Sequence, residues 1–339
     1  MKKYNSMEIK DVNNISVIMF GLLGDVLIRT PILRALKKIY PSVRVTAFVD
    51  EIGAAVLNNN PYCDEIVVVN RTKKNRVKYI INKMKSMFIL RQKKFDMIVD
   101  LYNGGSSHGM VSLSGIKYKL GLCNSKKKSI YNIECVNNSL QIQSFYKNYI
   151  DIIKPLSKEV FDLKPVFEVT KRNTLDINLE NKYLLNFGSG GLEKIMSFEK
   201  YFFLVKYIYE KYNFSPAVIL NPGQEFLQED FIKDFLIDSG IDYIKLPSLN
   251  LNEVTGLMGD TKFIITPDTG LMHLAMSQNS YIYVLFTYTN PILVDLRDEK
   301  FFSVFEGFRE DELHKEQNIT QETLITSIDA MFYKIKTAV

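Results

Sequence analysis

Three loops of this chain carry side chains that could bind an anion or move a proton. In the first loop, residues 20–31, Asp25 follows two glycines and precedes a helical stretch that begins at Val26. A carboxylate there is either the N-cap of that helix or a general base that the helix N-terminus keeps ionised. The loop does not read Gly-x-Gly-x-x-Gly, and the only acid that closes the next strand is Asp50, so a nicotinamide site is not indicated.

The second loop, residues 266–275, reads Thr-Pro-Asp-Thr-Gly-Leu-Met-His-Leu-Ala and opens a helix. We expect the exposed N–H groups of Thr269, Gly270 and Leu271, with the helix dipole behind them, to form an anion site suited to a diphosphate. His273 lies about one turn into this helix. It either lies near the anion or is a histidine of the core.

The third loop, residues 186–194, reads Asn-Phe-Gly-Ser-Gly-Gly-Leu-Glu-Lys. Glycines let a phosphate approach the backbone amides closely, and Lys194 beyond them supplies a positive charge. All three loops follow apolar runs, and loops that follow parallel strands gather at the carboxyl edge of a sheet. Together the three loops therefore indicate a ligand site more strongly than any one of them.

Short apolar runs alternate with helical stretches in two series, and each series starts with a glycine loop. Such runs are typical of parallel strands that helices cover on both faces. The first series comprises residues 15–20, 43–49, 65–69 and 96–101, and the second comprises residues 183–187, 217–220, 243–246, 263–266 and 281–286. We therefore expect an α/β fold of two facing Rossmann-like domains with a cleft between them.

The domain boundaries follow from where this alternation is interrupted. We expect an N-terminal Rossmann-like domain over residues 1–170 and a polar linker without sustained periodicity over residues 171–182. A C-terminal Rossmann-like domain then covers residues 183–320. We expect a final helix over residues 321–339 to pack back on the N-terminal domain.

The composition is that of a folded soluble protein, with 46% hydrophobic and 24% charged residues among 339. A chain of this length buries enough apolar surface to fold without disulfide or metal staples. Its three cysteines form no Cys-x-x-Cys pair and it has three histidines, which argues against a zinc site of the usual spacing. The start lacks the apolar stretch of a signal peptide and no apolar run reaches about 18 residues, so we expect a cytoplasmic protein.

Positive charge is concentrated in the first half of the chain. Residues 1–170 contain 27 Lys and Arg against 14 Asp and Glu, whereas residues 171–339 contain 16 against 24. Ten of the cations lie between Arg71 and Lys94, where no acidic residue occurs and apolar residues recur at helical spacing. This segment is either an ordinary surface helix or a basic amphipathic helix that meets an anionic membrane or a phosphorylated acceptor. No recognition motif supports a nucleic-acid face.

Several motifs occur in a fixed order along the chain: Gly-Asp-Val-Leu at residues 24–27 with Thr-Pro at 30–31, Ser-Gly-Ile-Lys-Tyr-Lys-Leu-Gly at 114–121, Pro-Asp-Thr-Gly at 267–270, and Leu-Phe-Thr-Tyr-Thr-Asn-Pro at 285–291. In combination they resemble glycosyltransferase family 9, the family of ADP-heptose:lipopolysaccharide heptosyltransferases. The resemblance implies a GT-B fold and inversion at the anomeric carbon. It also implies an ADP-activated heptose donor in the C-terminal domain and a lipid-A-linked inner-core acceptor, built from Kdo and heptose, on the N-terminal side.

The resemblance implies roles for individual residues. Asp25 looks like the base that takes a proton from the acceptor hydroxyl, Lys194 like the lysine that neutralises the donor diphosphate, and Glu225 like the acid that holds the ribose. The full donor set is Ser189, Gly190, Lys194, Glu225, Asp268, Thr269, Gly270 and His273, and we place Lys83, Lys85, Lys117 and Lys119 on the acceptor and membrane side. No metal or cofactor is implied, because the ADP-sugar is a co-substrate whose charge Lys194 and the helix amides offset.

The sequence also departs from the family pattern. Ile195-Met196 replaces the usual Trp-Pro after Lys194, and Thr287 stands where the family has Gly. Two alternatives therefore stay open: a relative that adds another nucleotide-activated sugar to a capsule or outer-core glycan, and a non-catalytic glycan-binding relative. As partners we expect a nucleotide-sugar donor, a lipid-linked glycan acceptor and the anionic inner-membrane surface, but no nucleic acid. The enzyme would then be peripheral on the inner face of the inner membrane.

Overall fold

The protein consists of two compact units, Met1–Glu168 and Val169–Val339. The computed structural model describes residues 9, 11–71, 76–122, 127–133, 143–170, 175, 177–294, 296, 298–305 and 319–337. The division falls two residues before the boundary at 170 that the sequence predicts. Described residues between the division and Lys182 form neither helix nor strand.

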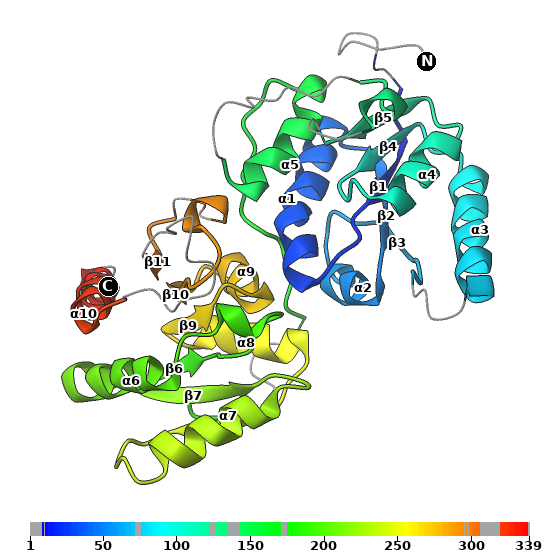
Figure 1. The fold of residues 1–339 in the computed structure, drawn as a ribbon. Coiled ribbons are helices and arrows are strands. Elements are labelled where there is room, and N and C mark those ends of the chain that lie inside the picture. The colour runs from blue at the N-terminus through cyan, green and yellow to red at the C-terminus, as the bar shows by residue number, and fades with distance from the viewer. Residues whose placement is uncertain are drawn as a thin grey trace, which may run out of the picture. The chain divides into compact units, whose positions relative to one another are not determined.

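The N-terminal unit is built on a five-stranded parallel sheet (Figure 1). In the order β3-β2-β1-β4-β5, its strands are β1 Asn14–Ile18, β2 Arg44–Val49, β3 Glu65–Val68, β4 Met97–Asp100 and β5 Tyr118–Gly121. The first four are the strands that the sequence predicts. The fifth strand, β5, was not predicted, because it has only four residues and one of them is a lysine.

Helices cover both faces of this sheet: α1 Leu23–Ile39, α2 Glu51–Leu57, α3 Arg76–Gln92, α4 Gly105–Leu113 and α5 Phe145–Ile153. In Figure 1, α1 and α5 lie on one face of the sheet, and α3 and α4 lie on the other. Pro31 lies inside α1 and cannot donate a backbone hydrogen bond to the carbonyl of Leu27. The Thr30 hydroxyl donates to that carbonyl at 2.7 Å instead, so the helix continues through the proline.

The C-terminal unit is built on a six-stranded parallel sheet with the order β11-β10-β9-β6-β7-β8. Its strands are β6 Lys182–Leu185, β7 Ser215–Leu220, β8 Ile244–Ser248, β9 Phe263–Pro267, β10 Tyr281–Leu285 and β11 Phe301–Val304. The first five were predicted and the edge strand β11 was not. An α/β architecture of two Rossmann-like units is thus confirmed.

The helical segments of this unit are η4 Leu192–Lys194, α6 Phe198–Tyr212, α7 Glu225–Phe231, η5 Ile232–Leu236, α8 Leu251–Asp260, α9 Gly270–Ser277, η6 Pro291–Leu293 and α10 Gln321–Thr337. Leu324, Ile328, Met331 and Phe332 of α10 are buried in the same hydrophobic cluster as the residues of α6 and β6. The predicted packing of this helix on the N-terminal domain is therefore wrong. An amphipathic pattern shows that one helix face is buried, but not which surface covers it.

Across the ranges described above, none of the helices combines the length and the apolar character needed to cross a membrane.

Candidate active site

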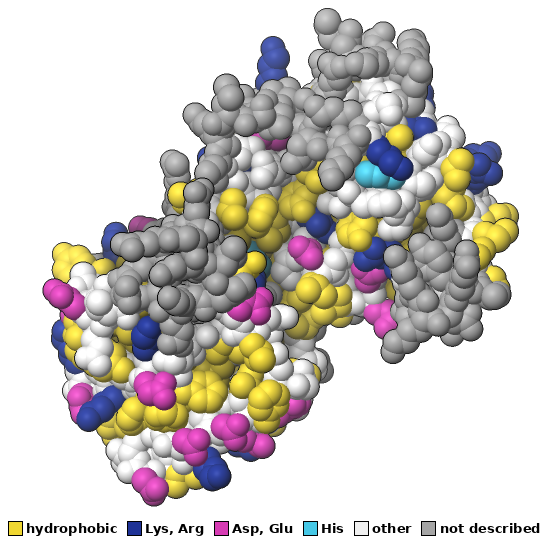
Figure 2. All heavy atoms as spheres, viewed as in Figure 1, with side chains coloured by type: hydrophobic (Ala, Val, Ile, Leu, Met, Phe, Trp, Pro, Cys, Tyr) yellow, Lys and Arg dark blue, Asp and Glu magenta, His cyan; other side chains and the backbone are white. Residues whose placement is uncertain are grey.

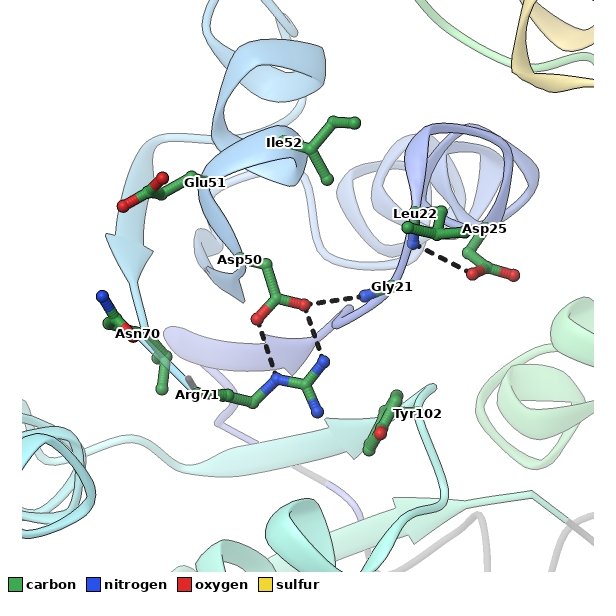
Figure 3. A pocket seen from close by; sticks show the side chains of 10 residues that line it. Gly21, Leu22, Asp25, Asp50, Glu51, Ile52, Asn70, Arg71 and Tyr102 are labelled. Carbon is green, nitrogen blue, oxygen red and sulfur yellow. Dashed lines mark hydrogen bonds and ion pairs between the residues drawn. The ribbon is translucent and has the colours of Figure 1, made fainter. Parts of the chain in front are cut away.

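The N-terminal unit has an open pocket of about 640 Å³ at the carboxyl ends of its strands (Figure 3). Gly21, Leu22 and Asp25 come from the segment after β1, and Asp50 follows β2. Arg71 follows β3, and Tyr102 follows β4. The pocket therefore lies where parallel α/β sheets bind ligands.

Asp25 is the third residue of α1, and Leu22 is the N-cap. Asp25 is therefore not the N-cap residue itself, but its side chain takes part in capping the start of α1. Its Oδ2 accepts a hydrogen bond from the backbone N–H of Leu22 at 3.0 Å, and the side chain is exposed. Gly21 has a φ of 147°, and a Cβ at this position would lie 2.7 Å from Asp25 Oδ2. A glycine at position 21 thus lets the carboxylate fold back over the loop.

A second carboxylate, Asp50, holds the other side of this loop. Its Oδ2 accepts the N–H of Gly21 at 3.0 Å, and the Arg71 guanidinium binds it in a bidentate manner through Nε at 2.8 Å and Nη2 at 2.7 Å. The guanidinium also lies over the rings of Phe20 and Tyr102, 4.4 and 4.5 Å from their centroids. The hydrogen bonds to Asp50 raise the pKa of Arg71 above its ordinary value, against the opposing effect of burial.

The two carboxylates have different environments although they accept hydrogen bonds from successive backbone N–H groups. Arg71 neutralises Asp50, whereas among the described residues no Lys or Arg forms an ion pair with Asp25. Figure 3 shows the Asp25 side chain on the opposite side of the loop from Asp50 and Arg71. Asp25 is therefore the carboxylate of this pair that no described cation compensates, and Asp50 holds the loop through Gly21.

Arg71 does not belong to the basic helix, although its sequence neighbours had indicated that it does. The helix α3 starts at Arg76, and Arg71 lies two residues beyond Val69, which is buried. Its position directly after an apolar strand is the signal that could have placed it at the pocket.

In the C-terminal unit, three loops are joined by the side chains of Asn186 and Asn221. Asn186 Nδ2 donates to Thr266 Oγ1 at 2.8 Å. The N–H of Gly188 is 3.0 Å from Asn186 Oδ1 and 3.1 Å from Asn221 Oδ1. A Cβ at Gly188 would lie 2.1 Å from Asn221, so the close approach requires glycine. The loops after β6, β7 and β9 are thereby held together at one sheet edge.

Ser189, Gly190 and Glu225 lie at neighbouring strand ends. The N–H of Ser189 donates to Gln224 Oε1 at 3.1 Å, and Gln224 Nε2 donates back to the Ser189 carbonyl at 2.8 Å. Glu225 follows as the first residue of α7. Gly190 is exposed, and a Cβ built there meets nothing within 4 Å, so space is open above this loop.

Lys194 and Asp268 form an ion pair across 74 residues of sequence. Lys194 Nζ lies 2.8 Å from Asp268 Oδ2, which also accepts a hydrogen bond from the Thr289 hydroxyl at 2.5 Å. The Asp268 side chain is 10% exposed and that of Lys194 is 29% exposed. The pair lies just before α9, whose N-cap is Thr269. The structure therefore places a cation and a helix N-terminus at the same edge, an arrangement suited to a diphosphate.

Two predictions about α9 need correction. The N–H of Leu271 is not free, because it donates to the Thr269 hydroxyl at 3.3 Å. His273 is 3% exposed, so it is a residue of the interior, as the alternative interpretation held. Gly270 begins the helix at the expected position.

The lysines expected on the acceptor side have different environments. Lys85 is exposed on α3, and Lys117 is exposed with its ammonium 4.6 Å from the Tyr118 ring centroid. Lys119 is only 8% exposed on β5, and burial lowers the pKa of its ammonium. A surface role for Lys119 therefore does not agree with the structure. The side chain of Lys83 lies outside the described residues.

Within the described ranges, no three or more His, Cys, Asp or Glu residues form a group that could hold a metal ion.

Comparisons with known proteins identify the family of this chain. The family model of glycosyltransferase family 9 (heptosyltransferase) matches residues 85–320. Lipopolysaccharide heptosyltransferase 1 of Campylobacter coli is 24% identical over 286 residues, which cover 78% of this chain and 81% of that protein.

Two solved structures have the same fold. The family 9 glycosyl transferase of Veillonella parvula superimposes with a TM-score of 0.81 at 18% identity, covering 97% of this chain and 100% of that one. The ADP-heptose lipopolysaccharide heptosyltransferase II of E. coli superimposes with a TM-score of 0.77 at 17% identity, covering 95% and 99%. This chain belongs to glycosyltransferase family 9, the heptosyltransferase family, and is a glycosyltransferase with the GT-B fold.

Proposed function

We propose that this chain transfers a heptose from ADP-heptose to the inner core of lipopolysaccharide, with inversion at the anomeric carbon. The observation that carries the proposal is the family match over residues 85–320, which includes the loops of Ser189, Lys194 and Asp268. The E. coli and Campylobacter relatives are by name lipopolysaccharide heptosyltransferases, and the name of the E. coli protein specifies ADP-heptose.

In this reaction Asp25 acts as the general base. Its carboxylate accepts the proton of an acceptor hydroxyl while that oxygen forms a bond to the anomeric carbon of the donor. The bond from the anomeric carbon to the diphosphate breaks, and ADP leaves with the electron pair. The exposed carboxylate of Asp25, with its single hydrogen bond from Leu22, supports this role.

Lys194 stabilises the charge that develops on the leaving diphosphate. In the structure Asp268 holds the lysine in place, and the N-terminus of α9 adds backbone N–H groups beside it. A diphosphate at this edge then competes with Asp268 for the ammonium, which leaves the carboxylate free to accept hydrogen bonds from sugar hydroxyls. Glu225 is the first residue of α7, at a neighbouring strand end, and in this scheme it binds the ribose. The ADP-sugar is the co-substrate, and the scheme uses no further cofactor.

The acceptor is lipid-linked, so the reaction takes place at the cytoplasmic face of the inner membrane. The excess of Lys and Arg in residues 1–170 supports peripheral binding to this anionic surface.

One feature of the donor loops favours a different sugar as the second candidate. The Thr287 hydroxyl donates to the carbonyl of Glu193 at 2.8 Å and so ties the loop after β10 to the segment of Lys194. The resemblance leads us to expect a glycine at position 287, where no such bond forms. A relative that uses another nucleotide-activated sugar would keep the phosphate contacts and differ at such positions.

A panel of nucleotides and a transfer assay test the proposal. At equal concentration ADP should raise the unfolding temperature more than UDP, GDP or CMP does, because the ligand that binds most tightly stabilises the fold most. At about 100 times its Kd, a ligand adds about 2.7 kcal/mol to the free energy of unfolding. Transfer of heptose from ADP-heptose to lipopolysaccharide that lacks heptose should then be detected by mass spectrometry. A larger shift with UDP or GDP would contradict the ADP assignment, and ADP binding without heptose transfer would favour the second candidate.

A further inference from the structure

The helix α3 has large hydrophobic side chains on its solvent side. Ile80, Ile81, Met84 and Phe88 are 48%, 46%, 67% and 66% exposed. At about 100° per residue, these four positions fall within one arc of roughly 100° around the helix axis. We call them the outer apolar face of α3.

The other side of the same helix is already used by the fold. Ser86 and Leu90 are buried, and Leu90 belongs to the hydrophobic cluster of the N-terminal unit with Phe48 and Ile98. By the same angular count, Ser86 and Leu90 lie on the side opposite to the outer apolar face. An ordinary surface helix has one apolar stripe, which packs on the core. α3 has a second one, and exposed apolar clusters of this kind mark interaction sites.

Charge identifies the partner. Ten Lys and Arg and no acidic residue lie between Arg71 and Lys94, and Lys85 on α3 is exposed. Arg71 is paired with Asp50 at 2.7 Å and Lys93 with Glu65 at 2.6 Å, so these two cations are already compensated. Five of the other eight belong to the sequence of α3. Figure 2 shows hydrophobic side chains on the surface beside Lys or Arg at the position of α3 in Figure 1.

We propose that α3 lies in the headgroup layer of an anionic bilayer and inserts its outer apolar face. Only such a layer offers a negative surface directly above a hydrocarbon region, which matches cations that flank apolar side chains. A second copy of this chain would bring two strongly basic segments together, which like-charge repulsion opposes. Nucleic acid would satisfy the charge but would leave Met84 and Phe88 in water.

This inference rests on the proposed function for its biological setting, because a lipid-linked acceptor requires the enzyme at the membrane. The inference adds a second contribution to membrane binding, which is the insertion of the outer apolar face into the bilayer. Salt does not screen this contribution to the affinity. Electrostatic attraction alone would be lost as salt shortens the screening length.

The test is sedimentation of the full chain with vesicles of phosphatidylcholine alone or mixed with phosphatidylglycerol. The double variant Met84→Gln, Phe88→Gln keeps every charge and should bind the mixed vesicles about tenfold more weakly or worse. The double variant Ile237→Gln, Tyr333→Gln is the matched control, because these side chains are 57% and 69% exposed in the C-terminal unit. The variant Lys85→Gln should lose about fivefold at low salt.

Tryptophan fluorescence gives a direct readout of insertion, because the chain contains no Trp. We expect the emission of the Phe88→Trp variant to shift to shorter wavelength when mixed vesicles are added. The emission of the Tyr333→Trp variant should not shift. None of these positions is buried, so the unfolding temperature should stay within a degree or two of the wild type, which checks that the variants fold.

The proposal is overturned if Met84→Gln, Phe88→Gln binds like the wild type, if the Phe88→Trp emission does not shift, or if neutral vesicles bind equally well. It is also overturned if the wild type is a dimer that the same double variant dissociates, which would make the face an interface between copies. The proposed function is judged separately, by ADP binding and by heptose transfer to a detergent-dispersed acceptor. The apolar-face variant should leave both unchanged.

Discussion

Replacing Asp25 with Asn should stop the reaction while leaving the fold intact. In the wild type the Leu22 N–H donates a hydrogen bond to Asp25 Oδ2 at 3.0 Å, and the amide oxygen of Asn can accept the same bond. The stability change is then limited to the loss of a negative charge in the first turn of α1, about 0.3–1 kcal/mol. For a unit of this size that corresponds to a shift in Tm of roughly 1–4 °C. Turnover should fall by about 10²–10⁴, the range of general-base assistance.

The variant Asp50→Asn is the matched control, because it neutralises the other carboxylate on the same loop. It breaks a bidentate pair with Arg71 in which the two side chains are 23% and 24% exposed. Exposed ion pairs contribute about 0–1 kcal/mol and breaking fully buried ones costs about 3–5 kcal/mol, so we expect a loss near 2 kcal/mol. Its turnover should fall less than that of Asp25→Asn, because the base is still present.

Both variants are measured by denaturant unfolding and by the initial rate of heptose transfer at saturating donor. If Asp25→Asn retained turnover within about tenfold of the wild type, Asp25 would not be the base. If Asp50→Asn lost turnover as completely as expected for Asp25→Asn while remaining stable, the roles assigned to the two carboxylates would be reversed.

Three further predictions concern the C-terminal unit. Lys194→Ala should weaken ADP binding, measured by calorimetry, by roughly 2 kcal/mol or more, because the diphosphate loses its countercharge. The control variant Lys206→Ala changes an exposed lysine and should have no effect on ADP affinity. Equal ADP affinities of the two variants would show that Lys194 does not face the phosphates. Gly188→Ala should destabilise the unit by about 1–3 kcal/mol, because its Cβ would lie 2.1 Å from a neighbouring side chain. Gly190→Ala is the control and should leave the Tm unchanged, since a Cβ there meets no atom within 4 Å. If Gly188→Ala were as stable as the wild type, the close packing of the loops would be refuted. Burial raises the pKa of Asp329, but hydrogen bonds from a lysine and two tyrosines outweigh it and hold the pKa below its usual range. The lowered pKa of Asp329 therefore stabilises the fold above about pH 4, and this contribution is lost at lower pH. In urea unfolding, the difference in free energy of unfolding between the wild type and Asp329→Asn should shrink as the pH falls below about 4. A difference that stays constant with pH would contradict this prediction.

Much of the architecture was predictable because strands of a parallel sheet are buried on both faces. Such strands appear in the sequence as continuous apolar runs, and the glycine loops mark where the chain turns into a helix. This is why nine of the strands were found from the sequence. The edge strand β11, Phe301–Val304, and the short β5 carry weaker signals, and their pairing with β10 and β4 makes them strands.

The residue types of the candidate site were also visible in the sequence, but their partners were not. Lys194 and Asp268 were both assigned to donor loops, yet their ion pair depends on β6 lying next to β9, which only the sheet order shows. In the same way Arg71 meets Asp50 because β3 pairs with β2. Spacing along a chain indicates which face or loop a residue occupies, whereas contacts between residues far apart in sequence depend on how the strands are ordered.

Burial was the second property that only the tertiary structure decided. The pattern around α9 allowed His273 to face either a ligand or the core, and the covering elements bury it to 3% exposure. The apolar positions of α10 predicted a buried face but not the sheet on which it packs. For α3 the sequence showed both charge and apolar residues, and the structure showed that Met84 and Phe88 point away from the core. Helical periodicity determines which residues share a side, and the packing of the rest of the chain determines which side meets water.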